Sequence, residues 1–372
     1  MITQEELSQK GCALFFTEGV SLKSWDKAGI LSREITFYNE LSRYFAKFYF
    51  LTYGTEDDLQ YRQRVAENIK IFPILRDLRK NGNNSLFQNI VRDVDFLRTH
   101  QVRGAQVALQ CKKENDLPLV VRCGYIWSLH HRQESHNPFT NWWVTSMEKK
   151  IFRECDAILC TSKAACQHAI KFCGNLNKPV QWIPNYVDTN LFKPLAIKKK
   201  RKSLIFVGRL VRQKNILALL EAIEGVSCSL TLVGEGPLRE MIFSFAQQKK
   251  ISLEYHQKVP NEELPFLLNQ HEIFVLPSLY EGMPKALLEA MSCGLAVIGS
   301  AIDGITDLIQ DGLNGCLSST HSMGLRQALL RLLENPTLRE KYGKSAQKSA
   351  QEKFSLQQVV KQEIRFYKDI LC

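Results

Sequence analysis

Short apolar runs alternate with longer amphipathic segments along the whole chain. Apolar runs of about four to eight residues that are bounded by turn residues are typical of buried strands. The runs that predict strands in the first half of the chain are 13–16, 48–53, 93–97, 118–121, 158–160 and 180–183. Those in the second half are 204–207, 229–233, 253–256, 273–276 and 296–298.

The amphipathic segments between these runs predict helices. The main ones are 31–45, 105–109, 215–223, 237–249, 324–334, 336–349 and 356–370. Strands that alternate with helices indicate parallel sheets, so we predict an α/β fold. The chain has 372 residues, more than a single core usually fills, and we therefore expect two domains.

The segment 276–299 is the most informative part of the sequence. It predicts a strand, a loop, a helix with Pro284 in its first turn and Gly294 at its end, and another strand. The loop holds one carboxylate, Glu281, and the helix holds a second, Glu289. Free N–H groups at the helix N-terminus bind anions, whereas carboxylates accept hydrogen bonds from hydroxyls. This combination suits a sugar nucleotide, which carries both phosphates and hydroxyls.

Two glutamates separated by seven residues, in the setting Tyr-Glu-Gly-Met-Pro (280–284) and Leu-Glu-Ala-Met-Ser-Cys-Gly (288–294), resemble the donor-site signature of family 4 glycosyltransferases. Three further segments, 183–194, 206–215 and 232–237, resemble other motifs of this family and occur in the same order. The resemblance covers about residues 183–317 and is specific, because four ordered segments match at family spacing.

The resemblance implies a GT-B fold, in which two Rossmann-like doubly wound domains face each other across a cleft. It implies an N-terminal acceptor-binding domain over residues 1–185 and a C-terminal nucleotide-sugar donor-binding domain over 186–354. It further implies that the C-terminal helix, within 355–372, packs back on the first domain.

The resemblance also assigns residues. Arg209 and Lys214 are assigned to the donor diphosphate and Glu281 to the hydroxyls of the donor sugar, and these three are the catalytic candidates. Glu289 is assigned to the ribose hydroxyls. The other donor-binding candidates lie in turns or at a helix start, namely Gly208, Gly234, Gly282, Met283, Pro284, Lys285, Val259 and Gly19. Each charged residue also has a purely structural interpretation, such as a surface cation or an (i, i+4) pair between Lys285 and Glu289.

The acceptor side and the nucleotide base are less determined. Many relatives have a histidine directly after the strand at 118–121, but here Arg122 stands near that point and two loop histidines, His130 and His131, follow downstream. All three are acceptor-side candidates. A glycine is common in the family where Gln257 stands, so uridine, guanosine and adenosine all remain open.

The formal net charge is +11, which favours phosphate-bearing substrates or an anionic membrane surface. Trp142 and Trp143 precede several basic residues, so they could stack on sugars or rest at a membrane interface, but we expect them to pack in the core. The segment 62–80 predicts an amphipathic helix that contacts a membrane and is kinked by Pro73. Basic residues without a recognition motif do not predict binding to nucleic acid.

Composition narrows the remaining possibilities. The chain has no apolar run long enough to span a membrane and no secretory signal, so we expect a cytoplasmic protein, and association with the cytoplasmic face of the membrane remains an open alternative. Eleven scattered cysteines indicate buried thiols in a reducing compartment. No metal-ligand spacing is present, so we expect neither a metal nor a cofactor, with a nucleoside-diphosphate sugar as substrate.

These observations predict a retaining, metal-independent glycosyltransferase that moves a sugar to an acceptor hydroxyl, in cell-envelope polysaccharide or glycolipid synthesis. The expected acceptor is a glycan or a lipid-linked saccharide. Two alternatives remain open, a non-catalytic sugar-nucleotide-binding protein and another GT-B activity such as a phosphorylase or an epimerase.

Overall fold

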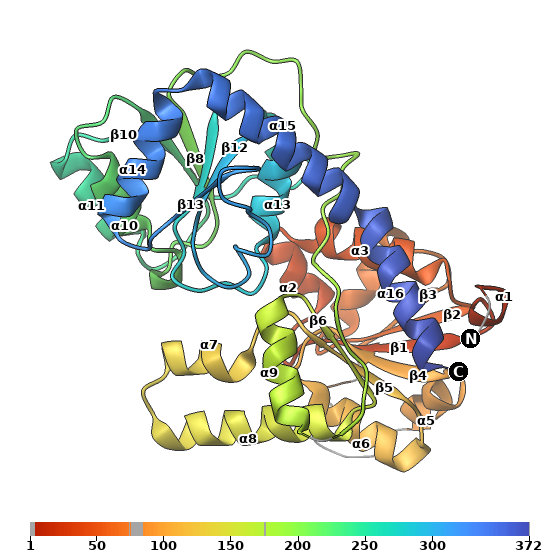
Figure 1. The fold of residues 1–372 in the computed structure, drawn as a ribbon. Coiled ribbons are helices and arrows are strands. Elements are labelled where there is room, and N and C mark those ends of the chain that lie inside the picture. The colour runs from red at the N-terminus through yellow and green to blue at the C-terminus, as the bar shows by residue number, and fades with distance from the viewer. Residues whose placement is uncertain (1–3, 74, 76–84, 175, 372) are drawn as a thin grey trace. The chain divides into compact units, whose positions relative to one another are not determined.

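The computed structural model describes residues 4–73, 75, 85–174 and 176–371. The chain divides into two compact units, which we call the N-terminal unit (1–184 with 360–372) and the C-terminal unit (185–359). Each unit has its own parallel sheet with helices packed on it (Figure 1).

The N-terminal unit contains a seven-stranded sheet in the order β3-β2-β1-β4-β5-β6-β7, with every neighbouring pair parallel. Its strands are β1 (Gly11–Phe15), β2 (Lys47–Leu51), β3 (Ile69–Phe72), β4 (Phe96–Thr99), β5 (Leu119–Cys123), β6 (Ala157–Cys160) and β7 (Val180–Trp182). Its helices are α1 (Gln4–Leu7), α2 (Leu22–Lys27), α3 (Leu31–Ser42), α5 (Ser85–Arg92), α6 (Ala105–Asn115), α7 (Trp127–Glu134), α8 (Pro138–Glu154) and α9 (Lys163–Cys173), with the 3-10 segment η1 (Glu56–Arg64). The inner strands are buried on both faces, which explains their continuous apolar sequences.

The C-terminal unit contains a six-stranded parallel sheet in the order β10-β9-β8-β11-β12-β13. Its strands are β8 (Ser203–Val207), β9 (Ser229–Val233), β10 (Ser252–His256), β11 (Ile273–Leu276), β12 (Ala296–Ser300) and β13 (Cys316–Ser318). Its helices are α10 (Ile216–Ile223), α11 (Arg239–Gln248), α12 (Leu264–Asn269), α13 (Lys285–Ser292), α14 (Ser322–Leu333) and α15 (Pro336–Lys353), with the 3-10 turn η2 (Arg212–Lys214). The order changes direction between β8 and β11, the kind of switch point where open α/β sheets bind ligands.

The last helix, α16 (Leu356–Ile370), contributes most of its length to the N-terminal unit. There Glu363 and Arg98 form an ion pair whose side chains are 3% and 0% exposed. Arg98 Nε donates to Glu363 Oε1 at 2.8 Å and to the Tyr367 hydroxyl at 2.6 Å. Its Nη1 donates to the Tyr38 hydroxyl at 3.0 Å, so every arm of the buried guanidinium has an acceptor.

Three predictions about local structure are wrong. Residues 69–72 form β3, paired with β2, instead of part of a helix, because the alternation of Ile69, Lys70 and Ile71 fits a strand at the sheet edge. The rest of the predicted helix lies partly outside the described residues. The strand predicted at 93–97 begins only at Phe96, because the Asp95 carboxylate caps the start of β1 by accepting from the Gly11 N–H at 2.7 Å.

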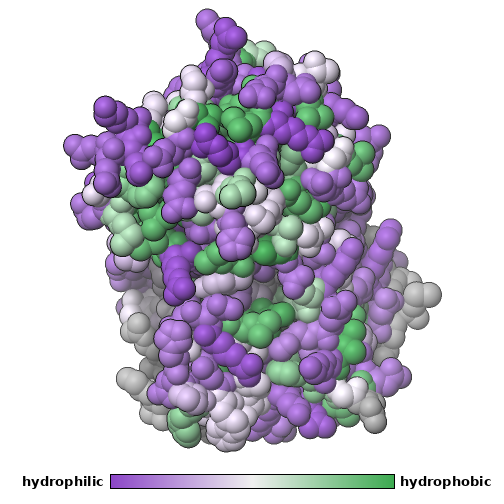
Figure 2. All heavy atoms as spheres, turned by 60° about the vertical axis from the view of Figure 1, so that its left-hand side comes forward, coloured by the Kyte–Doolittle hydropathy of each residue, from purple (hydrophilic) through white to green (hydrophobic). Residues whose placement is uncertain are grey.

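The third correction concerns the tryptophans that were expected in the core. Trp142 and Trp143 are exposed on α8, with 64% and 44% of their surface accessible. On the face shown in Figure 2, hydrophilic residues predominate and hydrophobic ones form small separate groups. No helix in the described part of the chain is both long enough and apolar enough to cross a membrane.

Candidate active site

Several predicted site residues lie directly after strands of the C-terminal unit. Parallel strands place the turns that follow them at one edge of the sheet. Four of these segments matter here, which we call the β8 turn (208–215), the β9 turn (234–238), the β11 loop (277–284) and the β12 loop (301–308).

The β8 turn and the β11 loop are joined by a ladder of hydrogen bonds. The Leu279 N–H donates to the Gln213 carbonyl at 2.8 Å, and Gln213 Nε2 donates to the Tyr280 carbonyl at 2.8 Å. Asn215 Nδ2 donates to the Pro277 carbonyl at 3.0 Å. These bonds satisfy the backbone of both segments and hold the charged side chains between them in place.

The charged pair at this junction is Lys214 and Glu281. The Lys214 ammonium contacts Glu281 Oε1, and the two side chains are 13% and 8% exposed. Ser278 Oγ donates to the same carboxylate oxygen at 2.7 Å. Sequence reasoning chose both charged residues but not their pairing, nor the supporting Ser278, Gln213 and Asn215.

Arg209 has a different environment in the same turn. Its side chain is exposed, and Nη2 donates to Gln213 Oε1 at 3.2 Å. No carboxylate of the described residues pairs with it. Arg209 therefore remains a cation at the edge of the site that is available to an anion.

Glycines allow the four segments to pack closely. Gly234 has φ 137°, and a Cβ there would lie 2.0 Å from the carbonyl oxygen of Gly208. Gly304 in the β12 loop has φ 80°, and a Cβ there would lie 1.8 Å from the carbonyl oxygen of Gly282. Gly304 was not predicted as a site residue, although the Asp-Gly dipeptide after an apolar strand was a signal for a tight turn.

The β11 loop leads directly into α13, so the first N–H groups of this helix lie next to the loop. Pro284 is the N-cap residue, and the helix proper begins at Lys285. Pro284 has no side-chain acceptor to cap the first turn, so those N–H groups depend on other partners. Met283 is buried, and its carbonyl accepts from Asn185 Nδ2 at 2.6 Å, which fixes the entry to the helix.

The remaining donor-side candidates are on the same helix or beyond β10. Glu289 is 2% exposed on α13. The Lys285 ammonium lies 5.0 Å from the ring centroid of Tyr186, so its charge is directed to an aromatic face. Val259 is half-buried after β10, and Gln257 Nε2 in that connection donates to Glu235 Oε1 in the β9 turn at 2.9 Å.

The N-terminal unit contains the acceptor-side candidates and also Gly19, which was predicted as a donor-binding residue. Gly19, with φ 77°, follows β1 and is exposed, while Arg122 lies within β5 and donates its N–H to Thr99 Oγ1 at 3.1 Å. His130 and His131 are on α7 rather than in a loop, which corrects the prediction. The His130 ring lies 4.8 Å from that of Tyr125, and His131 Nε2 is 3.2 Å from Thr140 Oγ1.

The cysteines of the described chain are free thiols, most of them buried. Burial raises the pKa of Cys111 and Cys155 to about 12, so both thiols are protonated at neutral pH. The described residues also contain no group of three or more His, Cys, Asp or Glu side chains that could hold a metal ion.

Comparison with known protein families assigns the two halves of the chain. The model of the family "Glycosyltransferase Family 4" matches residues 36–191, and that of "Glycosyl transferases group 1" matches residues 187–349. The chain belongs to the family 4 glycosyltransferases.

Curated relatives of this glycosyltransferase match part of the chain. The N-acetyl-alpha-D-glucosaminyl L-malate synthase of Bacillus anthracis is 28% identical over 52% of this chain and 55% of its own. An Escherichia coli UDP-Gal:alpha-D-GlcNAc-diphosphoundecaprenol alpha-1,3-galactosyltransferase is 31% identical over 49% of this chain and 54% of its own. The alpha-maltose-1-phosphate synthase of Mycobacterium tuberculosis is 24% identical over 61% of this chain and 66% of its own. The chain thus spans about half to two thirds of the length of the curated relatives it matches.

Solved structures establish the fold. Sucrose-phosphate synthase from Thermosynechococcus elongatus superposes with a TM-score of 0.76 at 17% identity, covering 97% of this chain and 99% of the other. Anabaena HepE in complex with UDP and glucose also gives 0.76, at 18% identity and the same coverage. These matches and the two parallel sheets confirm the predicted GT-B fold class.

Proposed function

We propose that this family 4 glycosyltransferase moves a sugar from a nucleoside diphosphate to an acceptor hydroxyl, with retention of configuration and without a metal. The observation that carries the proposal is the exposed Arg209 beside the Lys214–Glu281 pair at the strand ends of the C-terminal unit. Arg209, a cation without a carboxylate partner among the described residues, can bind phosphate, and the carboxylate of Glu281 can accept hydrogen bonds from sugar hydroxyls.

In this proposal the C-terminal unit binds the donor. Arg209 and Lys214 neutralise the diphosphate as it leaves, assisted by the N–H groups that start α13. Glu281 and Glu289 accept hydrogen bonds from the sugar and ribose hydroxyls and so position the donor. The departing phosphate oxygen takes the proton of the acceptor hydroxyl on the same face of the sugar, which preserves the anomeric configuration.

The N-terminal unit binds the acceptor, with Arg122, His130 and His131 as its candidates. We propose a UDP-sugar as the first donor class to test, because HepE was solved with UDP and glucose and the E. coli relative is named for UDP-Gal. A glycan or lipid-linked saccharide at the cytoplasmic face of a membrane is the proposed acceptor, and the E. coli relative's name includes such a lipid diphosphate.

The test compares Arg209→Ala with Arg212→Ala. Arg212 is an exposed cation three residues further along the same turn, so its loss changes the net charge equally. We expect turnover of the donor to fall about 100-fold or more in Arg209→Ala, the loss seen when one stabilising group at a developing charge is removed. Arg212→Ala should stay within about threefold of the unaltered protein.

Three results would contradict the proposal. Equal turnover in both variants would remove Arg209 from the reaction. Donor binding without hydrolysis or transfer in the unaltered protein would favour a non-catalytic sugar-nucleotide-binding role, whereas formation of a glycosyl phosphate from inorganic phosphate would favour a phosphorylase.

A further inference from the structure

Helices α7 and α8 of the N-terminal unit pack against each other as a hairpin that extends beyond the sheet (Figure 1). The buried side chains of α8 are Val144, Glu148, Ile151 and Phe152, which recur at helical spacing along one face. This face anchors the helix to the unit and leaves the opposite face to solvent.

The solvent-facing side of α8 has an unusual composition. Its first half carries Phe139, Trp142 and Trp143, which are 71%, 64% and 44% exposed. Its second half carries the exposed cations Lys149, Lys150 and Arg153. We call these six residues the α8 stripe.

The aromatic part of the stripe is not explained by contacts within the protein. The ring centroids of Phe139 and Trp142 lie 6.2 Å apart, with the two rings tilted by 35°. The Trp143 and Trp127 rings pack edge to face, with their centroids 6.2 Å apart. Most of the surface of Phe139 and Trp142, and 44% of that of Trp143, nevertheless remains accessible to water. Apolar surface gathered at one exposed place is typical of an interaction site.

The basic part of the stripe is also uncompensated. No carboxylate of the described residues forms an ion pair with Lys149, Lys150 or Arg153. Three positive charges therefore continue the line of the aromatic side chains along the same helix face. From Phe139 to Arg153 the helix rises about 21 Å, at about 1.5 Å per residue.

The hairpin is held by a buried carboxylate. Glu148 is fully buried and accepts hydrogen bonds from the N–H groups of Trp127 and Ser128 at 2.7 and 3.3 Å, which caps the start of α7. Its other contact is His168 Nε2 on α9, at 3.0 Å. The stripe is thus preformed, and binding through it would cost little ordering of the backbone.

We infer that the α8 stripe docks this protein on an anionic lipid bilayer. Tryptophan and phenylalanine partition into the boundary between headgroups and acyl chains, while lysine and arginine pair with the lipid phosphates. A line of like charges beside the aromatics fits an anionic surface better than a neutral glycan or a second copy of the same stripe, which would bring equal charges together. This inference rests on the proposed function in one respect, because it explains how a membrane-held acceptor is reached.

The test measures binding of the full-length chain to vesicles, without any donor. The vesicles contain phosphatidylcholine alone or with about one-third phosphatidylglycerol. We expect binding only to the anionic vesicles. The variants Phe139→Ser/Trp142→Ser and Lys149→Glu/Lys150→Glu should each bind the anionic vesicles at least about tenfold more weakly. The first variant loses apolar side chains that enter the bilayer, and the second reverses two charges that attract the lipid phosphates.

Matched controls replace residues of the same kind elsewhere. Phe266→Ser removes an aromatic side chain that is 55% exposed on α12, and Lys341→Glu/Lys353→Glu makes the same change in net charge on α15. Both controls should bind the vesicles like the unaltered protein. Equal losses in the controls and the stripe variants would overturn the inference, because general charge and hydrophobicity would then suffice.

A second readout locates the tryptophan. Brominated acyl chains should quench the protein's fluorescence on binding, and Trp142→Phe/Trp143→Phe, which keeps both side chains aromatic and apolar, should lose most of that quenching while it still binds. Quenching that persists in this variant would contradict the insertion of the stripe tryptophans into the bilayer. Concentration-dependent dimerisation that is abolished by the stripe variants would also overturn the inference. The same holds if an oligosaccharide, without vesicles, protects Trp142 from a quencher dissolved in water.

The two proposals fail separately. Donor-induced thermal stabilisation should be the same in the unaltered protein and in both stripe variants. Donor binding without vesicle binding would overturn only the membrane inference, whereas vesicle binding without any donor binding would overturn only the proposed function.

Discussion

Lys214 and Glu281 come from segments 67 residues apart and meet at the site. Their types and positions could be predicted from the sequence, because short motifs around each match a known family. Their pairing could not, because it depends on how the β8 turn meets the β11 loop. In the structure the Lys214 charge is balanced by Glu281, whereas Arg209 has no carboxylate partner among the described residues. This is why Arg209, rather than Lys214, gives the cleaner mutational test.

A single methyl group at Gly304 should disturb the site. Gly304→Ala would place a Cβ 1.8 Å from the Gly282 carbonyl oxygen, whereas Gly225→Ala, at a similar φ of 70°, meets nothing within 4 Å. Both substitutions cost about 1 kcal/mol for the left-handed backbone. Only Gly304→Ala must also shift the β11 loop, so we expect a drop in melting temperature several degrees larger and a donor affinity at least about tenfold weaker.

Donor titration and thermal melting of the two variants measure this difference. Equal behaviour of Gly304→Ala and Gly225→Ala would show that the close approach of the β12 and β11 loops does not shape the donor site.

The bounds of helices and strands were predicted best where a hydrophobic pattern continued over many residues or where turn residues enclosed an apolar run. Strands β9 and β11 and helix α16 begin and end at the predicted residues. Strand β13 was missed because Cys316–Ser318 ends in a polar residue and forms no continuous apolar run, and β3 was assigned to a helix because basic residues surround it. The exposure of Trp142 could not be predicted, because an aromatic residue at helical spacing is more often buried than exposed.

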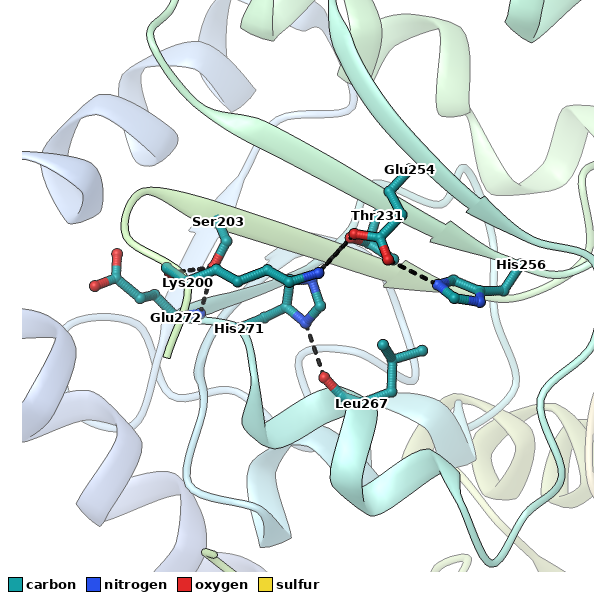
Figure 3. Close-up of polar contacts among 8 residues, drawn as sticks. All are labelled: Lys200, Ser203, Thr231, Glu254, His256, Leu267, His271 and Glu272. Atoms are coloured by element: carbon teal, nitrogen blue, oxygen red, sulfur yellow. Dashed lines mark hydrogen bonds and ion pairs between the residues drawn. The ribbon is translucent and has the colours of Figure 1, made fainter. Parts of the chain in front are cut away.

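A buried histidine links a strand and a helix of the C-terminal unit (Figure 3). His271 Nδ1 lies 2.8 Å from the Leu267 carbonyl of α12, and Nε2 lies 2.8 Å from Thr231 Oγ1 on β9. A carbonyl only accepts, so Nδ1 carries a proton. The Thr231 hydroxyl donates to Glu254 Oε2 at 3.3 Å, and Glu254 Oε1 lies 3.1 Å from His256 Nε2. Burial lowers the pKa of His271 from its usual 6.5, despite the bond to Leu267.

This arrangement predicts a loss of stability in mild acid. Between the lowered folded pKa of His271 and the unfolded value of 6.5, the unfolded chain binds more protons, so stability falls as the pH drops below 6.5. Urea unfolding at about pH 7.5 and about pH 5.5 measures the effect. His271→Gln should reduce the pH dependence in this window, and the exposed control His136→Gln should not. An unchanged pH dependence in His271→Gln would contradict the assignment.

At the scale of the whole molecule, the structure adds a buried contact between β4 and the last helix, α16, that the sequence could not predict. The pattern of 356–370 predicts an amphipathic helix, but not that Glu363 pairs with Arg98, 265 residues earlier. Glu363→Gln leaves a buried guanidinium without its carboxylate, so the free energy of unfolding of the N-terminal unit should fall by about 3–5 kcal/mol.

A double-mutant cycle, followed by urea unfolding, measures the interaction free energy between Arg98 and Glu363. Arg98→Met/Glu363→Leu removes both charges and should lose less stability than the sum of the single variants. Additive losses would show that the two side chains do not act as a pair.

The most direct test of the central claim is a thermal-shift panel of UDP-, GDP- and ADP-sugars, with and without EDTA, on the unaltered protein, Arg209→Ala and Arg212→Ala. A ligand that binds only the folded state raises the melting temperature. We predict a rise with one nucleotide class that is insensitive to EDTA, is lost in Arg209→Ala and persists in Arg212→Ala. No rise with any sugar nucleotide, or an equal rise in both variants, would contradict it.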